Sequence, residues 1–281
     1  MKITIVGAGY VGLSLSVLFA QKYNTVTLDI DQNKVNLINK GISPIKDKET
    51  EEYLKSKKLN LLATVDKDFA YKNSDFVIVA TPTNYDAEIN SFNTSQVEEV
   101  IGDALSFNKD AVIVIKSTVT PGTTDYLQMR YSDKKIAFVP EFLRERCAYE
   151  DFVHNHNVLV VGTEDEDVYS KIVESHGNLP KNFCKLNVIE SELVKYFSNT
   201  YKATKITFAN SFHKLSTELG ADYTKIKDTF LLHGVTEGEY LSVNEEFGGY
   251  AGMCLPKDIK AIKTLVNELG LDLDVFEFID N

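Results

Sequence analysis

The sequence of 281 residues has few cysteines and no long apolar run, and each absence excludes a class of protein. Its three cysteines, Cys147, Cys184 and Cys254, are odd in number and lack paired spacing, which argues against a disulfide framework and a zinc site. No run of about 18 apolar residues is present, so we expect no membrane-spanning helix. A strand is predicted at residues 3–6 with no secretory signal before it, and we therefore expect a cytoplasmic protein.

Basic clusters are also missing, because 41 acidic residues outnumber 30 basic ones and give a net charge of −11. Neither nucleic acid nor a membrane surface is therefore expected as a partner. The five histidines share no spacing with cysteines or carboxylates that would complete a metal site, so we expect surface or packing roles for them. With 43% hydrophobic residues, the chain can form the core of one large or two ordinary domains.

Residues 2–31 carry the most informative pattern in the chain. A short apolar run at residues 3–6 stops at Gly7, and Gly7, Gly9 and Gly12 form G-x-G-x-x-G where this strand should turn into a helix. Helical spacing of apolar residues over 10–23 and a β-branched strand at 25–28 complete a βαβ unit. Such a loop lets the backbone approach a pyrophosphate, which binds at the N-terminus of the helix.

Asp29 ends the second strand of this unit and selects the cofactor. A carboxylate at that position accepts a hydrogen bond from a ribose 2′-hydroxyl and repels a 2′-phosphate, which favours NAD over NADP. Three glycines in an ordinary turn are the alternative, and the combination of strand, helix and Asp29 weighs against it.

The rest of the chain predicts a doubly wound, Rossmann-like parallel sheet at 1–189, followed by a mainly helical region at 190–281. Strands are expected at 59–63, 76–80, 111–115, 136–139, 158–161 and 185–188. Helices are expected at 32–40, 48–57, 66–71, 94–105, 123–131 and 165–176, then at 190–219 with a local irregularity, and at 222–232. Ligands bind beyond the carboxyl ends of such strands, which draws attention to segments 81–83, 117–118 and 140–145.

Seven segments, in order along nearly the whole chain, resemble the UDP-glucose/GDP-mannose dehydrogenase family, and most of all its bacterial UDP-glucose 6-dehydrogenases. They are GAGYVGLSL at 7–15, GISPI at 41–45, ATPTNYD at 80–86, KSTVTPG at 116–122, PEFLRE at 140–145, ELVKYFSNT at 192–200 and CLPKD at 254–258. The resemblance implies NAD-dependent oxidation of the C6 alcohol of a nucleotide sugar, most simply UDP-glucose to UDP-glucuronate, through a cysteine thiohemiacetal and thioester.

Catalytic roles follow from the same resemblance. Cys254 matches the nucleophile, and its place after a glycine-containing loop and near a helix start favours a thiolate. We expect Cys147 and Cys184 to be small buried hydrophobes. The catalytic set implied is Cys254, Lys195, Asn199, Asp258, Thr118, Glu145 and Glu141, with Lys195 and Asn199 on one helical face as oxyanion stabilisers and Thr118 and Asp258 around a water. A solvated helix face is the alternative for Lys195 and Asn199.

Binding residues complete the expected site. For the cofactor they are Gly7, Gly9, Tyr10, Val11, Gly12, Asp29, Lys34, Thr83, Thr118 and Glu145. For the nucleotide sugar they are Glu141, Phe142, Leu143, Lys195, Asn199, Tyr250 and Gly252. Apolar residues of the helical half exceed what one buried face needs, and the family is dimeric, so we expect a homodimer.

Three departures from the family pattern leave alternatives open. The chain ends where the family continues into a third, nucleotide-binding domain, which we expect to be absent here. Ala251 and Met253 replace residues common in the family loop, and residues 234–246 contain no arginine for the sugar site. A non-catalytic NAD-binding module of the same family, or a two-electron alcohol dehydrogenase with a structural Cys254, therefore remain as alternatives.

Overall fold

The computed structural model describes residues 1–56, 58–86, 88, 91–144, 147–244, 248–250, 252 and 254–280. The chain divides into two compact units, one of residues Met1–Asn84 and Phe92–Lys195, the other of Tyr85–Ser91 and Tyr196–Asn281. The sequence led us to expect a boundary between residues 189 and 190. In the structure the division falls inside a helix, between Lys195 and Tyr196.

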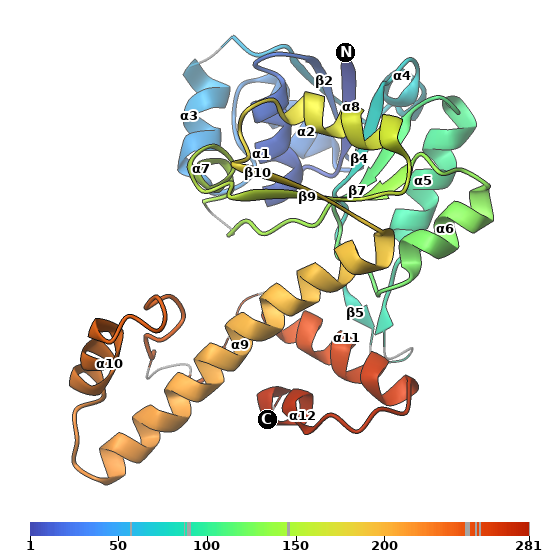
Figure 1. The fold of residues 1–281 in the computed structure, drawn as a ribbon. Helices are drawn as coiled ribbons and strands as arrows, with labels where there is room; N and C mark the ends of the chain where they lie inside the picture. Colours follow the sequence, from blue (N-terminus) through green and yellow to red (C-terminus); the bar gives the residue numbers. More distant parts are fainter. Residues whose placement is uncertain are drawn as a thin grey trace. The chain divides into compact units, whose positions relative to one another are not determined.

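The first unit is built on an eight-stranded sheet in the order β10-β9-β8-β7-β4-β1-β2-β3. All neighbouring strands are parallel except β8 and β9. The strands are β1 (Lys2–Val6), β2 (Asn24–Leu28), β3 (Leu61–Thr64), β4 (Phe76–Val79), β7 (Val112–Ile115), β8 (Ile136–Phe138), β9 (Val158–Gly162) and β10 (Asn182–Leu186). The predicted doubly wound α/β fold is thus confirmed (Figure 1).

Helices cover both faces of this sheet, because its central strands are buried on either side. One face packs on α1 (Tyr10–Phe19), α2 (Gln32–Asn39), α3 (Lys48–Ser56), α7 (Ala148–His154) and α8 (Glu166–His176). The other packs on α4 (Lys67–Tyr71), α5 (Ser95–Phe107) and α6 (Thr123–Tyr131). Consecutive residues of β1 show the division, since Ile5 belongs to the first core and Val6 to the second.

The second unit is helical. It contains most of α9 (Val188–Glu218), with α10 (Tyr223–Leu232), α11 (Leu255–Glu268) and α12 (Asp274–Asp280). A short pair of strands, β5 (Tyr85–Asp86) and β6 (Ser91–Phe92), forms a separate sheet, and β5 contacts α11 (Figure 1). No helix in the described part of the chain is long and apolar enough to cross a membrane.

Two local predictions were wrong. The strand expected at 185–188 lies at Asn182–Leu186, because β10 is an edge strand whose residues Asn182, Phe183 and Cys184 are exposed and carry little apolar pattern. Val188 instead begins α9 and is buried. The irregularity expected within 190–219 is not seen, since α9 runs as one α-helix of 31 residues.

Candidate functional site

The glycine loop after β1 has the geometry of a dinucleotide-binding turn. Gly7 has a φ of +103°, and a Cβ built on it would lie 2.6 Å from the carbonyl oxygen of Ala80. A Cβ on Gly12 would lie 1.9 Å from the carbonyl oxygen of Gly7, so the helix packs on the turn only without a side chain there. Gly9, in contrast, faces open space, since apart from Gly9 and its two chain neighbours no described residue has an atom within 4 Å of the position that a Cβ would take.

Helix α1 begins at Tyr10, directly after this open position, with Val11 as its second residue. The first turn of an α-helix has N–H groups without intrahelical acceptors, so the open space adjoins donors suited to a phosphate. Asp29 lies at the end of β2, where its carboxylate accepts the Ala8 N–H at 2.6 Å and the Asp31 N–H at 2.9 Å. Lys34 approaches this carboxylate at 3.7 Å. The residues present therefore fit NAD.

The loop after β4 contacts both the glycine turn and the loop after β7, and the strand order reverses between β1 and β4. The Thr83 hydroxyl donates to the Thr118 carbonyl at 2.6 Å, and the Ser117 hydroxyl donates to the Thr81 carbonyl at 2.7 Å. Thr83 is buried and Thr118 is half-buried. A reversal of this kind is where open α/β sheets bind their ligands. The structure thus brings Thr83 and Thr118 together, and their place beside the nicotinamide stays a prediction.

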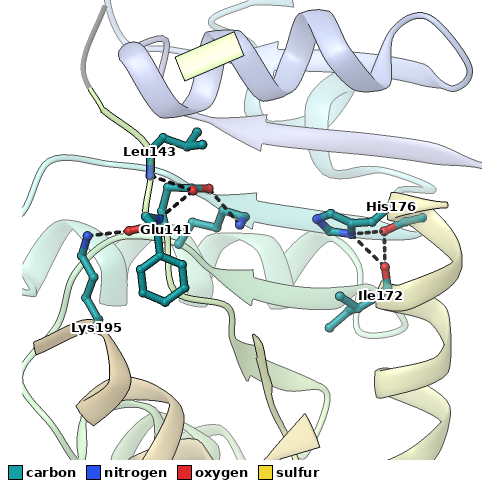
Figure 2. Close-up of polar contacts among 8 residues, drawn as sticks. Glu141, Leu143, Ile172, His176 and Lys195 are labelled. Atoms are coloured by element: carbon teal, nitrogen blue, oxygen red, sulfur yellow. Dashed lines mark hydrogen bonds and ion pairs between the residues drawn. The ribbon is translucent and has the colours of Figure 1, made fainter. Parts of the chain in front are cut away.

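Glu141 follows β8 and is the centre of a hydrogen-bonded group (Figure 2). Its carboxylate accepts from the buried Lys116 ammonium at 3.0 Å and from the N–H groups of Phe142 and Leu143 at 2.8 and 3.3 Å. Its carbonyl accepts from the Lys195 ammonium at 2.5 Å. Since this carboxylate binds one lysine and two N–H groups of its own loop, Glu141 organises the loop. The catalytic or substrate contact that the sequence suggested for it stays a prediction.

Two neutral histidines, His156 and His176, lie near Lys116. Burial, followed by the positive charge of Lys116, lowers the pKa of His176 to about 3 and that of His156 to about 4. The rings lie 6.2 Å apart, and His176 Nδ1 hydrogen-bonds within α8 to the Ile172 carbonyl (Figure 2). His176 is buried and His156 is half-buried, which agrees with the packing role expected for them. Among the described residues, no cluster of three histidines, cysteines or carboxylates could hold a metal ion.

Cys254 lies in the second unit at the start of α11, where it occupies the N-cap position and is exposed. One turn later, Asp258 is almost fully buried, and its Oδ2 accepts from the Asn199 amide at 2.5 Å. The other oxygen, Oδ1, lies 3.6 Å from the Lys257 ammonium and has no hydrogen-bond partner among the described residues. The helix start expected at Cys254 is therefore present, and Asn199 and Asp258 form a direct pair.

The remaining predicted residues are only partly described. The Tyr250 hydroxyl donates to the Ile279 carbonyl at 2.9 Å, so this side chain contacts α12, and Gly252 has a φ of +93°. Glu145, Ala251 and Met253 lie outside the described residues. The expectation that Cys147 and Cys184 are buried was wrong, since Cys184 is exposed on the edge strand β10 and Cys147 is half-buried.

Among the described residues, four buried charged residues were not predicted from the sequence: Asp47, Lys116, Asp151 and Glu192. Lys116 and Glu192 lie inside segments quoted for the family resemblance, yet neither was singled out. Lys116 directly follows the apolar run 111–115, and a charged residue at the end of such a run is the signal that could have identified it. Glu192 has no such signal, because its contacts are with residues about 70 positions away.

Comparison with known proteins agrees with this geometry. Residues 1–178 match the NAD binding domain of the UDP-glucose/GDP-mannose dehydrogenase family, and residues 189–281 match its central domain. A UDP-glucose 6-dehydrogenase of Streptococcus pneumoniae is 40% identical, over 97% of this chain and 71% of the relative. That of Campylobacter jejuni is 36% identical, over 93% of this chain and 67% of the relative.

A solved structure of a UDP-glucose dehydrogenase from Pyrobaculum islandicum aligns with a TM-score of 0.90 and 27% identity, over 99% of this chain and 66% of that one. The chain thus spans roughly two thirds of the length of the relatives that it matches. With an NAD-binding domain and a central domain matched in sequence and in fold, this chain belongs to the UDP-glucose/GDP-mannose dehydrogenase family.

Proposed function

We propose that this chain oxidises the C6 alcohol of UDP-glucose to the carboxylate of UDP-glucuronate in two NAD-dependent steps. The observation that carries the proposal is Cys254, exposed at the start of α11, with the buried Asp258 one turn further along the same helix. The identity of 40% to a UDP-glucose 6-dehydrogenase supports UDP-glucose as the substrate.

The proposed chemistry assigns a separate task to each residue. NAD, when bound, would supply the hydride acceptor for two successive oxidations at C6, one NAD for each. After the first oxidation, the Cys254 thiolate adds to the aldehyde carbon and forms a thiohemiacetal, which the second oxidation converts to a thioester. Water then adds to the thioester carbon, the C–S bond breaks, and the acid and the Cys254 thiol are released.

Lys195 and Asn199 would stabilise the negative oxygen of these intermediates, because an ammonium and an amide are suitable donors. Asp258 would accept a proton from the attacking water, since its Oδ1 lacks a hydrogen-bond partner among the described residues. Thr118 would hold the same water, and Glu145 would assist thioester hydrolysis. Phe142, Leu143, Tyr250 and Gly252 are proposed to contact the sugar.

The cofactor residues are proposed from the loop geometry. Gly7, Gly9 and Gly12 with Tyr10 and Val11 would surround the pyrophosphate, and Asp29 the adenosine ribose. Lys34 would approach the same ribose or its phosphate, and Thr83 the nicotinamide. We further propose a cytoplasmic location, since reduced cysteines and NAD chemistry suit that compartment.

A homodimer is also part of the proposal. In the second unit, α9, α10 and the turn after α9 carry large apolar side chains that are at least two-fifths exposed: Phe197, Tyr201, Phe208, Phe212, Leu215, Leu219, Ile226, Phe230 and Leu232. Apolar surface of this extent on two helices is typical of an interface. A second copy of the chain is the partner that we propose for it.

The stoichiometry of NADH tests the enzymatic proposal. The wild-type chain should release two NADH per UDP-glucose, and Cys254→Ala should stop before the thioester. One NADH per sugar in the wild type would favour the two-electron alcohol dehydrogenase. Calorimetric binding of NAD without binding of UDP or UDP-glucose would favour a non-catalytic NAD-binding module.

A further inference from the structure

Glu192, in the first turns of α9, binds the N-terminus of a different helix, α6. Its side chain is fully buried. Oε2 accepts the Gly122 N–H at 2.6 Å, while Oε1 accepts the Thr124 N–H at 2.9 Å and the Thr124 hydroxyl at 2.6 Å. One carboxylate therefore binds three donors from the start of α6.

This carboxylate replaces the N-cap side chain that α6 lacks. The N-cap of α6 is Gly122, which has no side chain to cap the helix and adopts a φ of +96°. Acidic groups stabilise helix N-termini because they accept the unpaired N–H groups and oppose the helix dipole. Burial raises the pKa of Glu192, and the hydrogen bonds from Thr124 and Gly122 act in the opposite direction by favouring the carboxylate. Glu192 thus caps α6 from α9.

The loop that enters α6 is residues 117–122, here called the β7–α6 loop, and it contains Thr118. Its start is fixed by the Ser117 hydroxyl on the Thr81 carbonyl, and its middle by the Thr83 hydroxyl on the Thr118 carbonyl. Val119 is fully buried in the core beneath it. Glu192 fixes the remaining end, at Gly122.

The same turn of α9 is fixed on its other side. A Cβ at Gly162 of β9 would lie 1.9 Å from the Ser191 hydroxyl oxygen, so strand and helix pack closely at this point. Lys195, one turn after Glu192, donates to the Glu141 carbonyl at 2.5 Å. The start of α9 therefore carries Lys195 and the acceptor that fixes the β7–α6 loop.

We infer that Glu192 is a positioning residue for the reaction: it holds Thr118, through the β7–α6 loop, in register with Lys195. Its carboxylate acts through α6 and not on the reacting atoms, because its three hydrogen bonds all come from Gly122 and Thr124. The inference rests on the roles proposed above for Thr118 and Lys195, and its structural part can be tested without them.

Hydrogen exchange measured by mass spectrometry tests the structural part on the intact chain. Glu192→Gln keeps the shape but presents an amide N–H₂ group to the donors of α6, so exchange of the amides at 117–124 should rise at least tenfold. Thr124→Val removes the hydroxyl donor alone and should produce a smaller rise in exchange of the same amides. It keeps the test available if Glu192→Gln folds poorly. Glu218→Gln, exposed at the far end of α9, is the matched control and should change nothing. Unchanged exchange in both Glu192→Gln and Thr124→Val would overturn the inference.

Kinetics test the functional part. In Glu192→Gln, hydrolysis of the thioester should slow at least tenfold, so that the adduct on Cys254 accumulates in intact mass spectra. Faster exchange with an unchanged hydrolysis rate would refute positioning. If the wild-type chain oxidises no UDP-glucose, the proposed function fails, and the exchange measurements still decide whether Glu192 fixes the loop.

Discussion

Asn199 and Asp258 lie 59 positions apart in the sequence, and the amide of the first donates to the carboxylate of the second at 2.5 Å in the buried part of the second unit. The contact joins α9 to the first turn of α11, next to Cys254. One oxygen of this buried carboxylate is hydrogen-bonded and the other has no hydrogen-bond partner among the described residues, which supports the base role proposed for Asp258.

Asp258→Asn separates the chemical role of this residue from its structural role. The amide oxygen can still accept from Asn199, so we expect the free energy of unfolding to change by less than about 1 kcal/mol. Loss of the base should slow thioester hydrolysis by about 100-fold or more. Asn199→Leu is the converse variant, since it removes the hydrogen bond to the buried carboxylate and should cost about 1.5–3 kcal/mol. Urea unfolding and single-turnover kinetics measure the two effects, and full activity in Asp258→Asn would exclude the base role.

Gly9→Ala and Gly12→Ala should differ although both alter the glycine loop. At Gly9 the added methyl group enters open space, so the melting temperature should be retained while NAD binds at least tenfold more weakly. At Gly12 the methyl group would meet the Gly7 carbonyl oxygen at 1.9 Å, which forces helix and turn apart and should cost about 1–3 kcal/mol. Thermal unfolding and NAD titration by fluorescence distinguish the pair. Equal melting temperatures for the two variants would contradict the assigned geometry.

His176 should make the fold sensitive to acid. Its pKa is lowered to about 3 by burial, whereas an unfolded histidine titrates near 6.5, so the unfolded chain binds the proton first as pH falls. The contribution of His176 to the free energy of unfolding is therefore fully present above about pH 6.5. Below that pH the free energy of unfolding decreases, by about 2 kcal/mol at pH 5. His156, lowered to about 4, adds to the same trend.

Urea unfolding between pH 7 and pH 5 measures this effect. His176→Leu should flatten the pH dependence relative to the wild type, while His154→Gln, at an exposed position, should leave it unchanged. An identical slope in wild type and His176→Leu would show that another group is responsible.

Phe208→Asp tests the proposed homodimer. Phe208 is 51% exposed and its ring lies 4.7 Å from that of Phe212 on α9. A charge in the middle of an apolar interface should convert a dimer to a monomer at micromolar concentration, with the fold retained because the residue is exposed. Sedimentation velocity measures the mass and circular dichroism the fold. A wild-type chain that sediments as a monomer would contradict the dimer itself.

Local features were the part of this molecule that the sequence predicted well. The turn at Gly7, Gly9 and Gly12 and the carboxylate of Asp29 depend on residues that lie within one βαβ unit, and strand and helix periodicity there is strong. The alternation of predicted strands and helices along the chain correctly predicted the doubly wound sheet. Contacts across long separations were not predictable in this way: Glu192 reaches Gly122 over 70 positions. Edge strand β10 was predicted at the wrong residues, because solvent on one side removes the need for apolar residues.

Residues Tyr85–Ser91 belong to the second unit although the chain on both sides of them belongs to the first. The Tyr85 hydroxyl lies 3.2 Å from the Thr264 hydroxyl of α11. A recombinant fragment of residues 196–281 would therefore lack part of its own fold and leave α11 without this contact. No single cut of the chain separates the two units and leaves both intact. Separate expression therefore calls for a circularly permuted gene, or for joining the segment Tyr85–Ser91 to the second unit.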